Sequence, residues 1–361
     1  MYWQRAMNVL YISDANSTVI ESQVIGLINA LKSGNINITL LISGKHDALK
    51  NLNTSYKVYK NFPALPVLHW LTVVSLYLAL RNVERSTIIH LRTERCLRYL
   101  KILGFTKLYV DFRGLGLEET SLYKAEGSRI LYKARVCYHK ARRASLSKSS
   151  YHANYISPYL KNHLNLSCNV QSYTMIPSLV SDNFSFNLSG RMTIRKSLGI
   201  GEDEIVVVFS TSMIGKWQNN FEELLDHLDP NIWLLNLSRK EVNRPRTINK
   251  FLPYSEVGKF LSVADIGILI RSNDIVNNVS LPVKAVEYLS NGLHVFSNGS
   301  VPTLKYYADQ KGMYLNSLEH IAKFKTNLDE RFLNASHWHE FFGEKNIAQK
   351  YISQYKKIGS F

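Results

Sequence analysis

The stretch ADIGILI (residues 264–270), followed ten residues later by SLPVKAVEYLSNGLHVFS (residues 280–297), decides the fold class. It reads as an apolar strand, a short polar loop, a helix and a second strand. Pro282 suits the first helical position, because a helix leaves that N–H unpaired. Gly292 suits the left-handed residue that ends the helix. A strand–helix–strand unit predicts a parallel sheet covered by helices.

The same unit contains a candidate anion site. A helix that begins beyond the carboxyl end of a parallel strand presents free backbone N–H groups to a ligand. Lys284 places a cation in the first turn, where the helix dipole disfavours it, so an anionic ligand would offset its cost. Glu287 lies one turn later on the same side and would accept hydrogen bonds from sugar hydroxyls. The spacing suggests a cradle for a phosphate and a sugar; an ordinary capped helix with a solvated ion pair is the alternative.

The chain has 361 residues, which is long enough for two cores. Further buried-type strands with helical patterns between them predict an α/β protein of two Rossmann-like, doubly wound domains that face each other across a cleft. We expect the first domain at residues 1–178, a polar linker at 179–190 and the second domain at 191–340. Residues 341–361 should form a helix that crosses back to the first domain.

The positive charge is concentrated in the first half of the chain. The net charge is +16, of which residues 1–178 carry +14 and the remainder +2. This asymmetry suggests an anionic partner: a membrane surface, a nucleic acid or a phosphorylated substrate. The basic, aromatic-rich stretch 124–148 fits either a membrane-surface helix or a merely solvated one. The apolar run 67–80 is too short to span a bilayer, which favours a buried or interfacial helix.

The three cysteines, Cys96, Cys137 and Cys168, show no metal or redox spacing. Their odd number, without a secretory signal, predicts reduced thiols and a cytoplasmic location. The basic first half adds the expectation of a peripheral position on the inner face of the plasma membrane.

Several phrases occur in a characteristic order along the chain. They are IIHLRTE (88–94), VDFRGLGLEE (110–119), RKSLGI (195–200), VVVFSTSMIGKWQ (206–218) and NNVSLPVKAVEYLSNG (277–292). Together they resemble the family 4 glycosyltransferases of the GT-B fold, especially enzymes that build bacterial surface polysaccharides such as capsule and O-antigen. The resemblance spans roughly residues 7–310.

On the donor side, the resemblance implies that the loop at 210–217 approaches the diphosphate, with Lys216 as a catalytic cation. Glu287 matches the second glutamate of the family's E-x7-E motif, which usually binds the donor ribose. Val279 stands where the first glutamate would be, a departure that puts the contacts to the donor sugar in question. The donor-binding set implied is Ser212, Lys216, Arg239, Arg271, Leu281, Pro282, Val283, Lys284 and Glu287.

In the first domain, many relatives place a histidine near the reacting centre after a strand, where this chain has Asp111 and Arg113. We expect these two as catalytic candidates, with a structural ion pair as the alternative. The acceptor-side candidates occupy the ends of neighbouring strands. They are Asp14, Asn16, His90 and Arg92. For His90 alone a core histidine is the default interpretation, and Asp14 and Asn16 could equally be turn formers.

The resemblance implies a hexosyltransferase that moves a sugar from a nucleotide-diphosphate sugar to a glycan or polyprenyl-linked acceptor, with retention of configuration. We expect no metal or other cofactor, because the sequence has no His/Asp/Glu set at ligand spacing, and a cationic clamp would take the metal's place. The expected partners are the nucleotide sugar, the acceptor and an anionic membrane surface, but no nucleic acid. Two alternatives remain: a sugar-nucleotide epimerase of the same architecture, and a non-catalytic membrane- or nucleic-acid-binding protein.

Overall fold

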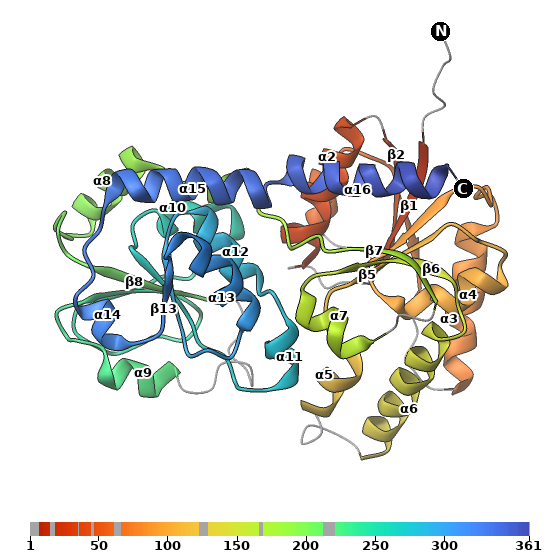
Figure 1. Cartoon of the computed structure of the whole chain (residues 1–361), viewed down its shortest axis with the longest axis horizontal. Helices are drawn as coiled ribbons and strands as arrows, with labels where there is room; N and C mark the ends of the chain where they lie inside the picture. Colours follow the sequence, from red (N-terminus) through yellow and green to blue (C-terminus); the bar gives the residue numbers. More distant parts are fainter. Residues whose placement is uncertain are drawn as a thin grey trace, which may run out of the picture. The chain divides into compact units, whose positions relative to one another are not determined.

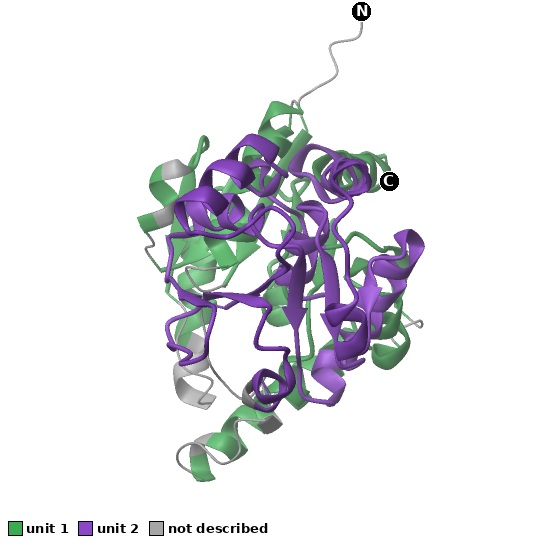
Figure 2. Cartoon of the chain, turned by 90° about the vertical axis from the view of Figure 1, so that its left-hand side faces the viewer, with its two compact units in different colours: residues 1–177, 347–361 green, residues 178–346 purple. Residues whose placement is uncertain are grey.

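The computed structural model describes residues 7–14, 19–34, 36–44, 47–60, 66–122, 129–165, 169–211 and 221–360. The chain divides into two compact units: unit 1 is residues 1–177 with 347–361, and unit 2 is residues 178–346 (Figure 2). Each unit contains one parallel sheet with helices between its strands (Figure 1). The prediction of two Rossmann-like, doubly wound domains is therefore confirmed.

Unit 1 has a seven-stranded sheet in the order β3-β2-β1-β4-β5-β6-β7, and all its strand pairs are parallel. The strands are β1 Met7–Ser13, β2 Ile36–Ser43, β3 Tyr56–Tyr59, β4 Ile88–Leu91, β5 Leu108–Phe112, β6 Tyr151–Tyr155 and β7 Val170–Thr174. The helices and helical turns are η1 Ile20–Ile25, α2 Gly26–Ser33, η2 Asp47–Asn51, α3 Pro66–Leu80, η3 Glu94–Cys96, α4 Leu97–Ile102, α5 Gly116–Leu122, α6 Arg129–Leu146 and α7 Pro158–Leu164.

The strand order of unit 1 reverses between β1 and β4, so helices cover both faces of the sheet. Right-handed crossovers place α2 on one face and α3, α4 and α6 on the other, as Figure 1 shows. The last helix, α16 (Glu344–Gly359), belongs to unit 1 from Ile347 onward. Its apolar side is buried, including the large side chains Tyr351 and Tyr355.

Unit 2 has a six-stranded sheet in the order β10-β9-β8-β11-β12-β13, and all its strand pairs are parallel. From β8 the chain adds β9 and β10 toward one edge of the sheet, and then β11, β12 and β13 toward the other. The strands are β8 Val206–Ser210, β9 Trp233–Leu237, β10 Thr247–Asn249, β11 Ile266–Leu269, β12 His294–Ser297 and β13 Tyr314–Leu315. The helices and helical turns are η4 Asp182–Phe184, α8 Leu188–Ser197, α9 Phe221–His227, α10 Tyr254–Leu261, α11 Ile275–Val279, α12 Val283–Ser290, α13 Pro302–Ala308, η5 Asp309–Lys311, α14 Leu318–Ala322 and α15 Leu328–Phe342.

The strand–helix–strand unit at 264–297 forms β11, α12 and β12, with one difference from the prediction. Pro282 has φ −58° and ψ 136°, so it is the residue before the helix, and Val283 is the first helical one. Gly292 has φ +69° and ends the helix as predicted. A Cβ at Gly292 would also lie 2.5 Å from the Arg331 carbonyl oxygen, so both backbone conformation and packing require glycine there.

Three further segments singled out in the sequence contain helices or helical turns. The stretch 179–190, predicted as a linker, contains η4 with the buried Phe184 and the first residues of α8. The basic stretch 124–148 contains α6, whose described side chains, apart from the buried Leu146, are exposed or half-buried. The apolar run 67–80 lies in α3. Among the described residues, no helix is long and apolar enough to cross a membrane.

Candidate functional site

The carboxyl edge of the unit 2 sheet brings several predicted donor-side residues near one another. The Tyr288 hydroxyl of α12 accepts a hydrogen bond from the backbone N–H of Ser210, the last residue of β8, at 3.0 Å. Arg271 follows β11, and its guanidinium is close enough to Tyr288 to influence that residue's pKa. Burial lowers the pKa of Arg271, and its Nε has no hydrogen-bond partner among the described residues. Thus α12 is held beside the start of the predicted diphosphate loop.

Glu287 and Lys284 form an ion pair on α12, with 2.7 Å between Lys284 Nζ and Glu287 Oε2. Only 1% of Glu287 is exposed, and its other oxygen, Oε1, makes no hydrogen bond to a described residue. Burial raises the pKa of Glu287, against the opposing effects of Lys284 and of the Tyr254 hydroxyl. The pair is thus partly buried, unlike the solvated pair of the alternative interpretation, and Lys284 holds the carboxylate in one orientation.

The other donor-side candidates lie in different surroundings. Leu281 is buried, whereas Pro282 and Val283 are half-buried at the start of α12. Arg239 follows β9, is exposed and stacks over Phe251 at 4.7 Å from its ring centre. Ser212 and Lys216 lie outside the described residues.

In unit 1, Asp111 and Arg113 form a buried ion pair at the carboxyl end of β5, with Arg113 Nε 2.8 Å from Asp111 Oδ2. Asn154 Nδ2 donates to Asp111 Oδ1 at 2.8 Å, and the Tyr351 hydroxyl donates to Oδ2 at 3.1 Å. Burial alone would raise the pKa of Asp111, but Arg113, with the nearby His90, holds it well below its usual range. Asp111 is fully buried, and both of its carboxylate oxygens accept hydrogen bonds from within unit 1.

Arg113 is the member of this cluster with donor capacity left over. Its Nε binds Asp111 and its Nη2 donates to the Tyr351 hydroxyl, while Nη1 has no partner among the described residues. Burial lowers the pKa of Arg113, but the Asp111 carboxylate, with Tyr351 and Tyr11, raises it by more, so the net pKa is raised and the guanidinium stays charged. A fixed cation with an unpaired N–H at the carboxyl end of a central strand is suited to an anionic or hydroxyl ligand.

His90 and Arg92 of β4 and its carboxyl end are also buried. His90 Nδ1 and the Tyr355 hydroxyl are 2.5 Å apart, and its Nε2 is 3.6 Å from Asp111 Oδ2. Burial lowers the pKa of His90, which favours the neutral ring. Arg92 donates to the Tyr11 hydroxyl at 3.3 Å. These contacts agree with the interpretation of His90 as a core histidine that supports Asp111.

The loop after β1 contributes a separate ion pair. Asp14 Oδ2 lies 2.5 Å from Nη1 of Arg95, a residue of η3. This ion pair joins the residue after β1 to η3, and the Asp14 side chain is 13% exposed. Asn16 lies outside the described residues.

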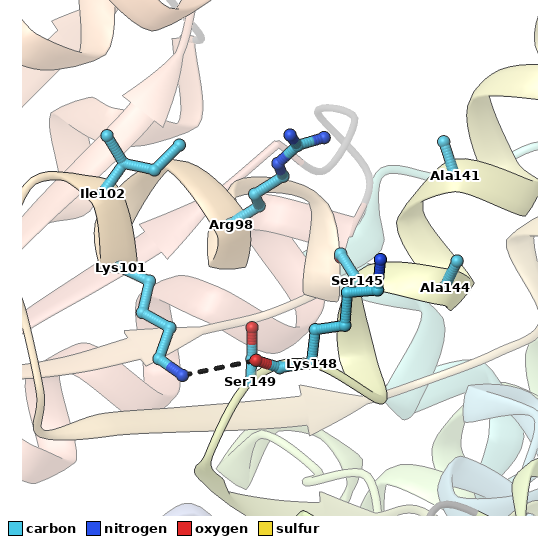
Figure 3. A pocket seen from close by; sticks show the side chains of 8 residues that line it. All are labelled: Arg98, Lys101, Ile102, Ala141, Ala144, Ser145, Lys148 and Ser149. Atoms are coloured by element: carbon cyan, nitrogen blue, oxygen red, sulfur yellow. Dashed lines mark hydrogen bonds between the residues drawn. The ribbon is translucent and has the colours of Figure 1, made fainter.

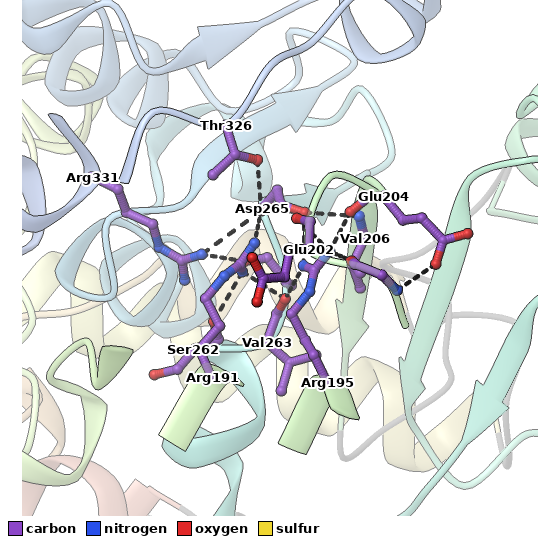
Figure 4. Close-up of polar contacts among 12 residues, drawn as sticks. Arg191, Arg195, Glu202, Glu204, Val206, Ser262, Val263, Asp265, Thr326 and Arg331 are labelled. Carbon is purple, nitrogen blue, oxygen red and sulfur yellow. Dashed lines mark hydrogen bonds and ion pairs between the residues drawn. The ribbon is translucent and has the colours of Figure 1, made fainter. Parts of the chain in front are cut away.

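A second buried carboxylate, Asp265, was not among the sequence candidates. It precedes β11 and accepts from Arg191 Nη2 at 2.6 Å, Arg195 Nη1 at 3.4 Å and the Val206 N–H at 2.8 Å (Figure 4). Arg331 approaches it at 3.9 Å. Arg195 comes from the RKSLGI phrase, so that phrase joins α8 to the amino end of the sheet. The signal available in the sequence was a lone acidic residue directly before the apolar strand IGILI.

Sequence reasoning also missed Tyr351 and Tyr355. They lie four residues apart on one side of α16 and are fully buried against Asp111 and His90. The available signal was the spacing Ile347, Tyr351, Tyr355 and Ile358 in an amphipathic helix. No group of three or more His, Cys, Asp or Glu side chains that could hold a metal occurs in the part of the chain that the structure describes.

The two parallel sheets and their strand orders define a GT-B fold. No family model matches the sequence, and no curated protein matches it. The structure is similar to that of HepE from Anabaena in complex with UDP, with a TM-score of 0.68, 12% identity, and coverage of 97% of this chain and 100% of that one.

Two further solved structures are similar over nearly the whole chain. Sucrose-phosphate synthase from Thermosynechococcus elongatus has a TM-score of 0.67 and 13% identity, with coverage of 98% of this chain and 99% of that one. WaaG, described as a glycosyltransferase involved in lipopolysaccharide biosynthesis, has a TM-score of 0.62 and 10% identity, with 98% of each chain covered. At these identities the likeness establishes the fold.

Proposed function

We propose that this protein is a glycosyltransferase that moves a sugar from a nucleotide-diphosphate sugar to a glycan or lipid-linked saccharide, with retention of configuration, in the synthesis of cell-surface polysaccharide. One observation carries the proposal: the carboxyl edge of the unit 2 sheet assembles Arg271 and the Lys284–Glu287 pair beside the end of β8. Support comes from HepE, a protein of the same fold that has been solved with UDP and with UDP-glucose.

In the proposed reaction, the bond between the anomeric carbon and the diphosphate oxygen breaks, the acceptor hydroxyl oxygen forms the new bond to that carbon, and the departing diphosphate takes up the hydroxyl proton. Negative charge develops on the departing diphosphate. Lys216, Arg271 and the first N–H groups of α12 would stabilise that charge, in the role that a metal ion has in other transferases. Glu287, oriented by Lys284, would accept hydrogen bonds from the donor ribose through Oε1.

Unit 1 would supply the acceptor side. Asp111 fixes Arg113, whose unpaired Nη1 would donate to the acceptor or the donor sugar. The acceptor would be a glycan on an anionic lipid carrier, and the enzyme would act from the cytoplasm at the inner face of the plasma membrane. The excess positive charge of residues 1–178 supports this part of the proposal.

The test is donor binding by calorimetry, with UDP and UDP-glucose as the first probes in a panel of nucleotide sugars. Glu287→Ala should weaken donor affinity by about tenfold or more, because hydrogen bonds to a charged group contribute roughly 1.5–3 kcal/mol. Glu256→Ala is the matched control, since Glu256 is a half-exposed glutamate of α10 that pairs with Lys259. Equal donor affinity in Glu287→Ala and wild type would remove Glu287 from the site, and no binding of any nucleotide sugar would refute the proposed function.

A further inference from the structure

A basic groove lies between α4 and α6, on the helical layer of unit 1 (Figure 3). Its volume is about 590 Å³. Three cationic side chains, Arg98, Lys101 and Lys148, line it, and no acidic residue does. Ile102 of α4 and two small residues of α6, Ala141 and Ala144, supply its apolar part. The groove therefore combines positive charge with apolar surface.

The three cations of this groove have no carboxylate partner among the described residues. Lys101 Nζ reaches only the Lys148 carbonyl oxygen, at 3.5 Å. Elsewhere on α6 the pattern is different: Arg142 pairs with Glu94 at 3.0 Å, and Arg143 with Glu118 at 2.7 Å. Because the groove cations are not neutralised within the fold, they are available to an external anion.

An exposed apolar stripe runs along α3. Leu71, Val74 and Leu78 are 44%, 53% and 55% exposed, and their spacing of three and four residues places them on one side of the helix. Tyr77, 49% exposed, lies beside them. A water-facing helix side normally carries polar residues, so this stripe suggests contact with an apolar phase.

The stripe and the groove belong to the same layer of unit 1. The crossovers β3–α3–β4, β4–α4–β5 and β5–α6–β6 run in one direction across the sheet, so their helices cover the same face. Figure 1 shows α3, α4 and α6 together, opposite α2 and α16. Ile102, which lines the groove, adds a further exposed apolar side chain to this layer, at 69% exposure.

We propose that this layer is a membrane-docking surface, in which the α3 stripe enters the lipid interface and the α4–α6 groove binds the phosphate of an anionic phospholipid head group. Charge complementarity identifies the anion, and the neighbouring apolar stripe favours a lipid over a nucleic acid, whose backbone offers no apolar partner. This surface would hold the enzyme at the membrane that carries its acceptor, so the proposal rests on the lipid-linked acceptor of the proposed function.

The experiment measures flotation of the full chain with phosphatidylcholine vesicles, with and without phosphatidylglycerol, at low and high salt. We expect binding only with phosphatidylglycerol and weaker binding at high salt. Arg98→Glu/Lys101→Glu/Lys148→Glu should lower the partition coefficient by about 10²-fold, since each cation near an anionic surface contributes about 1 kcal/mol. The matched control reverses three exposed lysines of unit 2: Lys196→Glu/Lys311→Glu/Lys325→Glu.

A second pair of variants tests the stripe. Val74→Ser/Leu78→Ser should lower the partition coefficient by about tenfold or more, as expected for side chains that leave the interface. Leu333→Ser, at a residue of α15 that is 68% exposed, should not. The proposal would be overturned if the protein bound vesicles equally well with and without phosphatidylglycerol. It would also be overturned if both the groove variant and the stripe variant kept wild-type vesicle binding. So would inhibition of vesicle binding by soluble glycerol phosphate at low concentration, which would assign the groove to a free phosphate.

The vesicle assay contains neither donor nor acceptor. Failure of docking would therefore leave nucleotide-sugar binding untouched, and failure of donor binding would leave the docking result standing.

Discussion

The two units have the same strand order about their switch points, yet each places its buried aspartate at a different end of the sheet. Asp265 of unit 2 lies at the amino end of β11, surrounded by arginines and the backbone N–H of Val206. Asp111 of unit 1 lies at the carboxyl end of β5, with an arginine that keeps one unpaired N–H. Parallel sheets bind ligands at their carboxyl ends. Burial and ion pairing alone therefore do not distinguish a carboxylate at the amino end of a sheet from one at the end where ligands bind.

The arginine partners of the two aspartates differ in how many of their N–H donors are used within the fold. Arg191 donates to the carbonyl oxygens of Ser262, Val263 and Ala264 as well as to Asp265, so its donors are used within the fold. Arg113 uses its donors only in part. We expect changes at the amino end to alter stability, and changes at the carboxyl end to alter turnover.

The largest expected effect is that of Asp265→Ala. It leaves three buried arginines without their shared carboxylate, which should lower the free energy of unfolding of unit 2 by about 3–5 kcal/mol. Denaturant unfolding measures the loss, and hydrogen exchange in β8 and β11 assigns it to unit 2. Asp226→Ala, at an exposed position of α9, should stay within about 0.5 kcal/mol of wild type. Loss of turnover with unchanged stability would contradict the structural role.

Lys216→Ala tests the opposite end of the unit 2 sheet. If Lys216 stabilises the departing diphosphate, turnover should fall by about 10²-fold while the unfolding midpoint stays the same. Lys196→Ala, at an exposed position of α8, is the control for loss of a positive charge. A turnover near that of wild type would reject the catalytic role of Lys216.

Asp111→Asn tests whether the carboxylate holds Arg113. Stability should fall by about 2 kcal/mol at neutral pH, because hydrogen bonds to charged groups contribute roughly 1.5–3 kcal/mol. The pKa of Asp111 is lowered in the folded state, so its contribution is complete above the unfolded pKa of about 3.9 and is lost as the pH falls below that value. Unfolding measured from neutral to acid pH should show this loss in wild type but not in Asp111→Asn. Asp47→Asn, at an exposed position of η2, should keep the wild-type profile.

The smallest effect separates two tyrosines of α16. Tyr351→Phe and Tyr355→Phe should each cost about 1 kcal/mol of stability, the net contribution of one hydrogen bond. Only Tyr351→Phe should also lower turnover, because Tyr351 contacts both Asp111 and Arg113, whereas Tyr355 contacts His90. Equal turnover in the two variants would mean that the orientation of Arg113 does not depend on α16.

Much of the fold could be predicted because its signals are local. Apolar strands such as VVVFS, and helix ends such as the left-handed Gly292, can be predicted from windows of about twenty residues. They depend on side-chain periodicity and backbone conformation, which are local properties. Pro282 shows the limit: its φ suits a helix, but its ψ of 136° places it one position before the helix.

The candidate site was predictable only in part. The Lys284–Glu287 pair lies within one helical turn, so its spacing predicted its contact. The tyrosines that hold the Asp111 cluster could not be predicted in the same way, because Tyr351 is 240 residues from Asp111 in the chain.

The sequence by itself determined two doubly wound units and the order of their elements, because hydrophobic period, glycine and proline act over short distances. Only the tertiary structure decided which buried carboxylate supports the sheet and which holds a partly free arginine. Arg195 and Asp265 are 70 residues apart, and no sequence period links them. Their contact arises from the way α8 and β11 pack in unit 2, just as the contact of Tyr351 with Asp111 arises from the return of α16 to unit 1.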